Sequence, residues 1–179
     1  MKKYLIIDSD KKYWPKDGQN IFFSKACFFD SNDYCDSSNN DFIKEYGIDI
    51  NQRKKDKNYL DKLNETLIDQ LSQNLNYFHK VNFSKKYWRI IIGPWINQLL
   101  PIIFNRWKKV ELCVEKKFDE ILCNADSSQN LTPIDMNDFL IKSQSSNWNN
   151  NLIAKILNFK NINFISIKKE VKKTKDNLS

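Results

Sequence analysis

The chain has 179 residues, of which 41% are hydrophobic and 28% charged, and this balance supports a buried core and excludes a wholly disordered chain. Only three glycines and four prolines occur, which excludes a collagen-like chain and disfavours a glycine-rich nucleotide-binding loop. The net charge of +7 would suit a nucleic-acid partner, but lysine far outnumbers arginine and the charge is spread along the chain, which disfavours nucleic acid.

Short apolar runs predict the strands. Residues 4–7 and 20–24 are bounded by turn residues, and residues 47–50 form a weaker run of the same kind. The first two runs do not alternate between apolar and polar side chains, which is typical of parallel strands buried on both faces. Residues 163–167 predict a last strand, whereas residues 118–123 fit either a strand or a helix end.

Periodic apolar residues predict two long helices. The first runs from about residue 56 to residue 79, where leucines recur every three or four positions. The second runs from Ser84, a suitable cap, to about residue 117; Gly93 and Pro94 should kink or break it, and its apolar residues should leave it largely buried. Two shorter helices are expected at residues 133–141 and 149–158. Together these elements predict a three-layer α/β fold with a short, mostly parallel sheet flanked by long helices.

We expect one α/β domain over residues 1–167 and a basic, disordered tail over residues 168–179. The four cysteines lack the spacing of a zinc site, and neither a signal peptide nor a transmembrane segment is predicted. These features indicate a protein of the reducing cytoplasm, and they leave open whether it works free in the cytoplasm or at the inner face of the membrane.

Candidate site residues centre on the one histidine and the three arginines. His79 ends the first long helix, where it fits either a partner of the last free carbonyls or a general base. Arg89 stands between Trp88 and an isoleucine, so we expect a buried guanidinium paired with an internal carboxylate or with a ligand anion. Arg53 opens the first helix, where a cation opposes the helix dipole, which favours an anion-facing role. Arg106 also stands next to a tryptophan, Trp107, as Arg89 stands next to Trp88. The aromatic residues around it belong either to the core or to a cleft.

Several blocks of the sequence resemble bacterial transferases of the leptospiral type, which are tied to surface-carbohydrate gene clusters. The matching residues are Trp14-Pro15, Cys27, Gln52-Arg53-Lys54-Lys55, His79, Ser84, Tyr87-Trp88-Arg89-Ile90, Gly93-Pro94-Trp95 and Asn105-Arg106-Trp107. The chain departs from the family pattern at four positions. Ala26 replaces a tryptophan, Gln52 and Asn105 stand where the family has aspartate, and Lys86 stands where it often has arginine.

The resemblance implies glycosyl transfer from a nucleotide-sugar donor to a carbohydrate acceptor in the synthesis of a cell-surface polysaccharide. It identifies the chain with the N-terminal, acceptor-side half of a two-domain glycosyltransferase-B-like enzyme. Such a half should have little activity until a partner chain supplies a donor domain, and it needs no cofactor or metal of its own. The resemblance implies that His79 is the base. It implies that Arg53, Arg89 and Arg106 hold anions and that Tyr87, Trp88 and Trp95 contact the substrate. The alternative is a non-enzymatic basic and aromatic module that binds an acidic glycan or nucleic acid.

Overall fold

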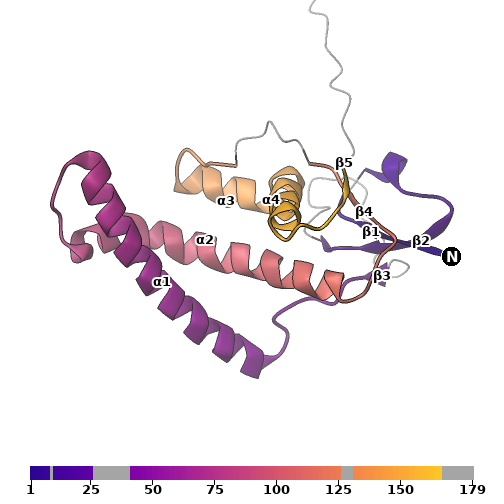
Figure 1. Ribbon diagram of the computed structural model, residues 1–179, viewed down its shortest axis with the longest axis horizontal. Helices are drawn as coiled ribbons and strands as arrows, with labels where there is room; N and C mark the ends of the chain where they lie inside the picture. The colour runs from indigo at the N-terminus through magenta and orange to yellow at the C-terminus, as the bar shows by residue number, and fades with distance from the viewer. Residues whose placement is uncertain (9, 26–40, 126–130, 167–179) are drawn as a thin grey trace, which may run out of the picture. The chain divides into compact units, whose positions relative to one another are not determined.

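The structure, a computed structural model, describes residues 1–8, 10–25, 41–125 and 131–166. Figure 1 shows the helices and strands of the chain, which divides into two compact units. The first unit comprises Met1–Ile43 together with Cys113–Ser179, and the second comprises Lys44–Leu112. The predictions for Ala26, for Cys27 and for the tail over residues 168–179 lie outside the described residues.

The first unit is built on a five-stranded parallel sheet with the strand order β3-β2-β1-β4-β5. The strands are β1 (Lys2–Ile6), β2 (Gly18–Phe22), β3 (Asp41–Phe42), β4 (Glu120–Cys123) and β5 (Ile165–Ser166). Central strand β1 is buried on both faces, with Tyr4, Leu5 and Ile6 almost inaccessible to solvent. This explains the unbroken apolar run at residues 4–7, because strands covered on both sides do not alternate.

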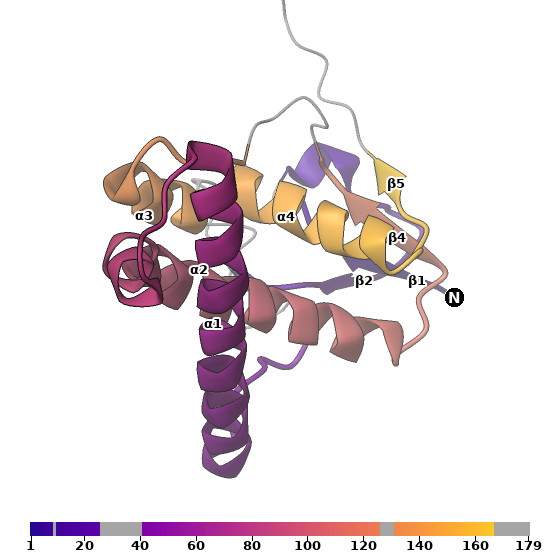
Figure 2. The same ribbon diagram turned by 60° about the vertical axis from the view of Figure 1, so that its left-hand side comes forward.

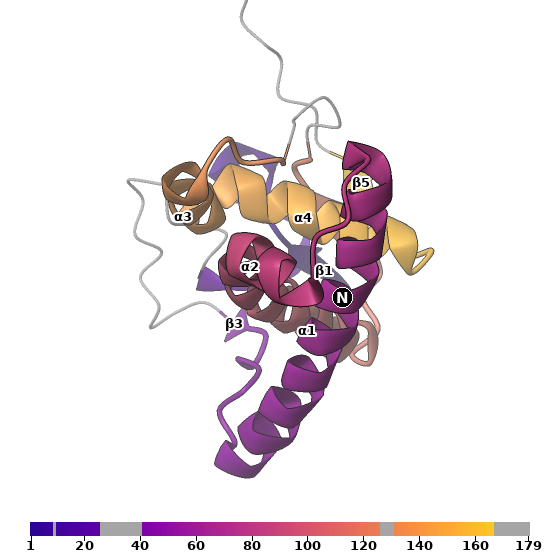
Figure 3. The same ribbon diagram turned by 90° about the vertical axis from the view of Figure 1, so that its left-hand side faces the viewer.

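Two helices connect β4 to β5 within the first unit. They are α3 (Met136–Gln144) and α4 (Ser146–Phe159), and Figures 2 and 3 show α4 following directly on α3. Ser145 ends α3 and caps α4, since its side chain accepts a hydrogen bond from the Trp148 main-chain N–H at 3.2 Å. Helix α4 packs on the sheet, where the Cys123 thiol of β4 contacts the Asn150 carbonyl.

The second unit contains helix α1 (Ile50–His79) and all but the last two residues of helix α2 (Lys85–Val114). Each of these helices has 30 residues. Helix α1 begins six residues before the predicted start, because the Asp49 side chain accepts from the Asn51 N–H at 2.8 Å and caps it. The predicted strand at residues 47–50 is therefore wrong. This segment instead contains a turn, with Gly47 at a φ of 82°, and the first residue of α1.

Helix α2 begins as predicted and ends close to the predicted residue. The Ser84 hydroxyl accepts from the Tyr87 N–H at 3.3 Å, which confirms Ser84 as the cap. No break occurs at Gly93 and Pro94, because the helix runs continuously through Pro94 and through Pro101. The expectation of a largely buried helix is also wrong, since most side chains after Pro94 are half-buried or exposed.

The elements confirm the α/β class and the parallel sheet, and they are consistent with the predicted three-layer fold. The ambiguous segment at residues 118–123 contains strand β4. Among the described residues, no helix is both long enough and apolar enough to cross a membrane.

Gly18 at the start of β2 has no room for a side chain. A Cβ there would lie 2.5 Å from Cε2 of Tyr4 and 2.6 Å from the main-chain oxygen of Lys2. We expect Gly18→Ala to lower the free energy of unfolding by about 1–3 kcal/mol, because the strand must move to relieve the clash. Urea denaturation followed by circular dichroism measures this change.

Gly93→Ala is the matched control. A Cβ at Gly93 would meet only Cγ of Arg89, at 3.7 Å, and alanine is the better helix former by about 1 kcal/mol. The control should be neutral or stabilising. Equal stability of the two variants would contradict the packing argument at Gly18.

Candidate functional site

The predicted site residues lie on α1 and α2, but they fall into two separate groups. Arg53 and His79 stand 26 residues apart on α1, which corresponds to about 39 Å along the helix axis. We name the group at the α1–α2 connection, His79, Tyr87, Trp88 and Arg89, the turn cluster. One small ligand does not contact both Arg53 and the turn cluster.

Asn76 holds the α1–α2 connection in place through three hydrogen bonds. Its side-chain amide donates to the Phe83 carbonyl at 2.9 Å, and its Oδ1 accepts from the Phe83 N–H at 3.0 Å and from Nε1 of Trp88 at 2.8 Å. These bonds join the end of α1 to the start of α2. They also fix Trp88, which is only 7% exposed and therefore offers little ring surface to a ligand.

His79 lies exposed at the end of α1 and packs against aromatic rings. Its imidazole stacks on Trp88 with 6.2 Å between ring centroids and meets Phe78 edge-on at 5.1 Å. The main chain of Lys80, in the left-handed conformation, donates to the carbonyls of Asn76 and Tyr77. The helix end is thus capped by Lys80, and the role of His79 as a base stays a prediction.

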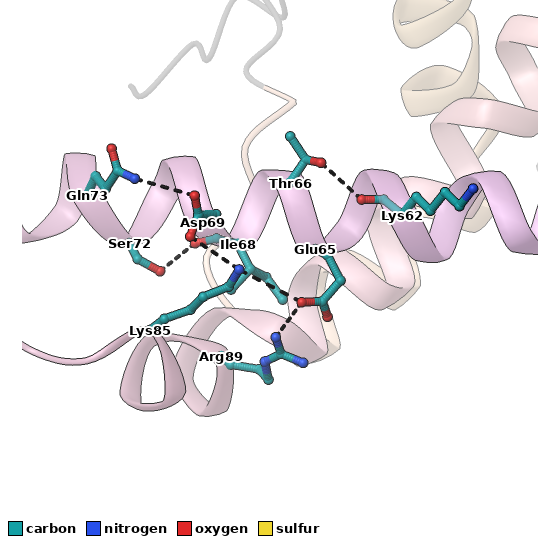
Figure 4. A network of polar contacts seen from close by, with 9 residues as sticks. All are labelled: Lys62, Glu65, Thr66, Ile68, Asp69, Ser72, Gln73, Lys85 and Arg89. Carbon is teal, nitrogen blue, oxygen red and sulfur yellow. Dashed lines mark hydrogen bonds and ion pairs between the residues drawn. The ribbon is translucent and has the colours of Figure 1, made fainter.

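Arg89 is exposed and paired with a carboxylate, as Figure 4 shows. Its Nη2 lies 2.5 Å from Oε2 of Glu65 on α1, and 47% of its side chain is accessible. Lys85 joins the same network through Asp69 at 3.2 Å and Glu65 at 3.9 Å. The expectation of a buried guanidinium is wrong, whereas pairing with an internal carboxylate is confirmed. Exposed ion pairs of this kind contribute roughly 0–1 kcal/mol to stability.

The remaining candidates lie further along α2. Arg106 is half-buried and donates from Nη1 to Oδ1 of Asn105 at 3.0 Å. Trp95 is half-buried, and Nε1 of Trp107 donates to Glu111 at 2.8 Å. Of the tryptophans of α2, Trp88 is buried, whereas Trp95 and Trp107 are half-buried. The stacking platform of the binding-module alternative therefore stays a prediction.

A cavity of about 400 Å³ lies between α1 and α2 within the second unit, and we name it the helix cavity. Arg53 lines it, and Asn105, the neighbour of Arg106, lines its other side. Most of its polar groups come from residues that the sequence did not single out. The polar and aromatic lining comprises Tyr46, Arg53, Asp56, Lys57, Asp61, Asn64, Asn97, Phe104 and Asn105.

Amide groups from both helices meet at the helix cavity. Nδ2 of Asn64 donates to Oδ1 of Asn97 at 2.5 Å. Oδ1 of Asn64 is buried and accepts no hydrogen bond from the part of the chain that the structure describes. A buried acceptor of this kind favours a ligand that donates a hydrogen bond, because leaving it unsatisfied costs free energy.

A fixed carboxylate forms one wall of the helix cavity. Asp56 accepts from the Tyr46 hydroxyl and from Nε2 of Gln52, both at 2.8 Å. Burial, followed by the hydrogen bond to Asp56, raises the pKa of Tyr46 to about 12, so the hydroxyl stays protonated and keeps donating at neutral pH. The amide at position 52 also has a local function, since an aspartate there would place a second negative charge beside Asp56.

A second cavity of about 540 Å³ also lies within the second unit, and Leu100 and Phe104 line both cavities. Its lining includes Tyr59, Leu63, Ile103 and Trp107. The ring of Phe104 lies 5.7 Å from that of Tyr59, which lines the second cavity, and 6.2 Å from that of Tyr46, which lines the helix cavity.

The sequence profile of the LIC12162 family transferases matches residues 3–179. The chain belongs to the LIC12162 family of transferases. This confirms the resemblance to leptospiral-type transferases, and it establishes a transferase family without naming the group that is transferred. A search of curated proteins and a search of solved structures found no match.

In this LIC12162 family transferase, no group of three or more metal-ligating side chains occurs among the described residues. The chemistry that the helix cavity offers is hydrogen bonding, from amides, carboxylates and cations beside aromatic rings. Sequence reasoning missed Asn64 and Asn97 because they lie 33 residues apart on different helices. Only the register between α1 and α2 brings them together, and no local pattern encodes that register.

Asn76→Ala tests the connection between the two helices. We expect it to lower the free energy of unfolding by about 2–3 kcal/mol, because three hydrogen bonds are lost and the buried Trp88 N–H is left without its acceptor. Urea denaturation followed by tryptophan fluorescence measures the change.

Asn74→Ala, on the exposed side of the same helix, is the control and should change stability by less than about 0.5 kcal/mol. Similar losses in both variants would show that Asn76 has no special role in the connection.

Proposed function

We propose that this chain binds the carbohydrate acceptor of a glycosyltransferase-like transferase in cell-surface polysaccharide synthesis. The observation that carries the proposal is the lining of the helix cavity, to which Asn64 and Asn97 contribute amides, Asp56 a carboxylate and Phe104 an aromatic ring. Membership of a transferase family supports the reaction class.

The lining of the helix cavity suits a polyhydroxylated ligand. Sugar hydroxyls both donate and accept hydrogen bonds, as do the amides of Asn64, Asn97 and Asn105. The apolar face of a sugar ring packs well on an aromatic side chain such as Phe104. A volume of about 400 Å³ also lies within the usual size range of small-molecule sites.

Charge favours an acceptor over a donor in this cavity. Asp56 and Asp61 offset Arg53 and Lys57, so the lining has no excess of positive charge for a nucleotide diphosphate. In the proposed scheme a separate donor-binding component holds the nucleotide sugar, and the chain alone transfers little. We place the reaction in the cytoplasm, at the inner face of the membrane.

Glycosyl transfer requires a base that removes the proton of the acceptor hydroxyl. His79 stands 23 residues beyond Asp56 on α1, roughly 35 Å along the axis, so it does not reach a sugar in the helix cavity. We therefore propose a carboxylate of this cavity, Asp56 or Asp61, as the base. Arg53 is the one predicted anion holder that lines the cavity.

The test begins with a glycan array of bacterial surface oligosaccharides, followed by calorimetric titration of the strongest hit. Asn97→Ala and Asp56→Asn should each weaken binding about tenfold, because each removes at least one hydrogen bond to a hydroxyl. His79→Ala is the control variant outside the cavity and should leave the affinity unchanged.

Competitor probes separate this proposal from the binding-module alternative. UDP-glucose should not compete with the glycan. Loss of affinity in His79→Ala, with no effect of the cavity variants, would contradict the assignment of the acceptor to the helix cavity. Binding of single-stranded DNA alone, falling steeply with salt, would favour the module.

A further inference from the structure

The connection between α1 and α2 exposes a group of large apolar side chains. Tyr77, Phe78 and Ile90 are 87%, 77% and 67% exposed, and the group is completed by Phe83, Tyr87 and Ile91. We name these six residues the turn tip; all lie within segment 77–91, at the end of the helical hairpin (Figures 1 and 3). Exposed large apolar residues gathered in one place mark an interaction surface.

All the charged side chains of segment 77–91 are positive. Segment 77–91 contains Lys80, Lys85, Lys86 and Arg89 and no aspartate or glutamate. Lys85 and Arg89 point back to Glu65 and Asp69 on α1 (Figure 4). Lys80 and Lys86 are exposed next to the turn tip, so positive charge borders the apolar residues.

The turn tip is held in a defined shape. Asn76 fixes the main chain at Phe83 on both its N–H and its carbonyl. The ring of Phe83 packs on Tyr87 with 4.3 Å between centroids, and Tyr87 meets the buried Trp88 at 5.3 Å. The rings of Phe83 and Tyr87 therefore lose little conformational freedom when they bind to another surface.

We propose that the turn tip inserts into the interface of an anionic lipid membrane. At such an interface tyrosine rings lie at the headgroup level, and phenylalanine and isoleucine are buried at the boundary between headgroups and acyl chains. Lys80 and Lys86 keep their charged ends at the headgroup level, where anionic lipids attract them. This charge complementarity favours a lipid surface over a second copy of the chain, because the same segment on a second copy would bring lysines together.

This inference stands apart from the proposed acceptor site, because none of the six turn-tip residues lines the helix cavity. The two proposals can therefore fail separately: the chain can bind the glycan without binding vesicles, or bind vesicles without binding the glycan.

Sedimentation with vesicles of phosphatidylcholine and phosphatidylserine tests the proposal on the full chain. We expect binding to mixed vesicles and at least tenfold weaker binding to pure phosphatidylcholine. Tyr77→Ser combined with Phe78→Ser should reduce binding to mixed vesicles at least tenfold. Lys80→Glu combined with Lys86→Glu should abolish the preference for the anionic lipid.

Ile48→Ser combined with Ile134→Ser is the control, since it removes two exposed apolar residues outside the turn tip and should bind like the parent. Circular dichroism of each variant confirms that it is folded. Absence of vesicle binding, equal binding to both vesicle types, or equal loss in the control would overturn the proposal. Sedimentation velocity without vesicles tests whether the turn tip binds a second copy of the chain. A dimer that the combined Tyr77→Ser and Phe78→Ser variant disrupts would overturn the proposal in favour of that partner.

Discussion

The hydrogen bonds of Asn76 are the constraint on which the second unit depends. One side chain satisfies the N–H and the carbonyl of Phe83 and the indole N–H of Trp88, and thereby joins two helices of 30 residues at their ends. A tight connection of this kind fixes the register of α1 against α2. Both surfaces discussed above follow from that register, since it sets which α1 residues face which α2 residues.

The two surfaces differ in chemistry although they share the same helices. In the helix cavity, amides and carboxylates are fixed by neighbours, as Asp56 is by Tyr46 and Gln52. Such preorganised polar groups suit recognition of hydroxyls, because little reorganisation is needed when a ligand binds. At the turn tip, apolar side chains are exposed beside lysines, and this combination suits the interface of a membrane, where polar headgroups meet apolar acyl chains. A transferase with both surfaces would meet its acceptor close to a membrane.

Local sequence predicts part of the fold correctly, but it predicts wrongly a strand at residues 47–50 and a break at Gly93 and Pro94. It gives no access to pairings that depend on tertiary register. The apolar run in β1 and the Ser84 cap follow from neighbouring residues alone. Arg89 was misplaced because its apolar neighbours suggested burial; successive residues of a helix point about 100° apart, so Trp88 faces inward while Arg89 faces Glu65 and solvent. The early start of α1 was missed because its first turns are too polar to show an apolar period, and only the Asp49 cap marks them.

Binding of a sugar in the helix cavity can be tested at its side-chain amides. The most direct measurement is a heteronuclear NMR titration of the isotopically labelled chain with the strongest oligosaccharide from the array, following the side-chain amides of Asn64, Asn97 and Asn105. We expect these three signals to shift together, along with the main-chain signals of the residues that line the cavity. Shifts confined to the turn tip or to the sheet, with the three amides unmoved, would contradict sugar binding in the helix cavity.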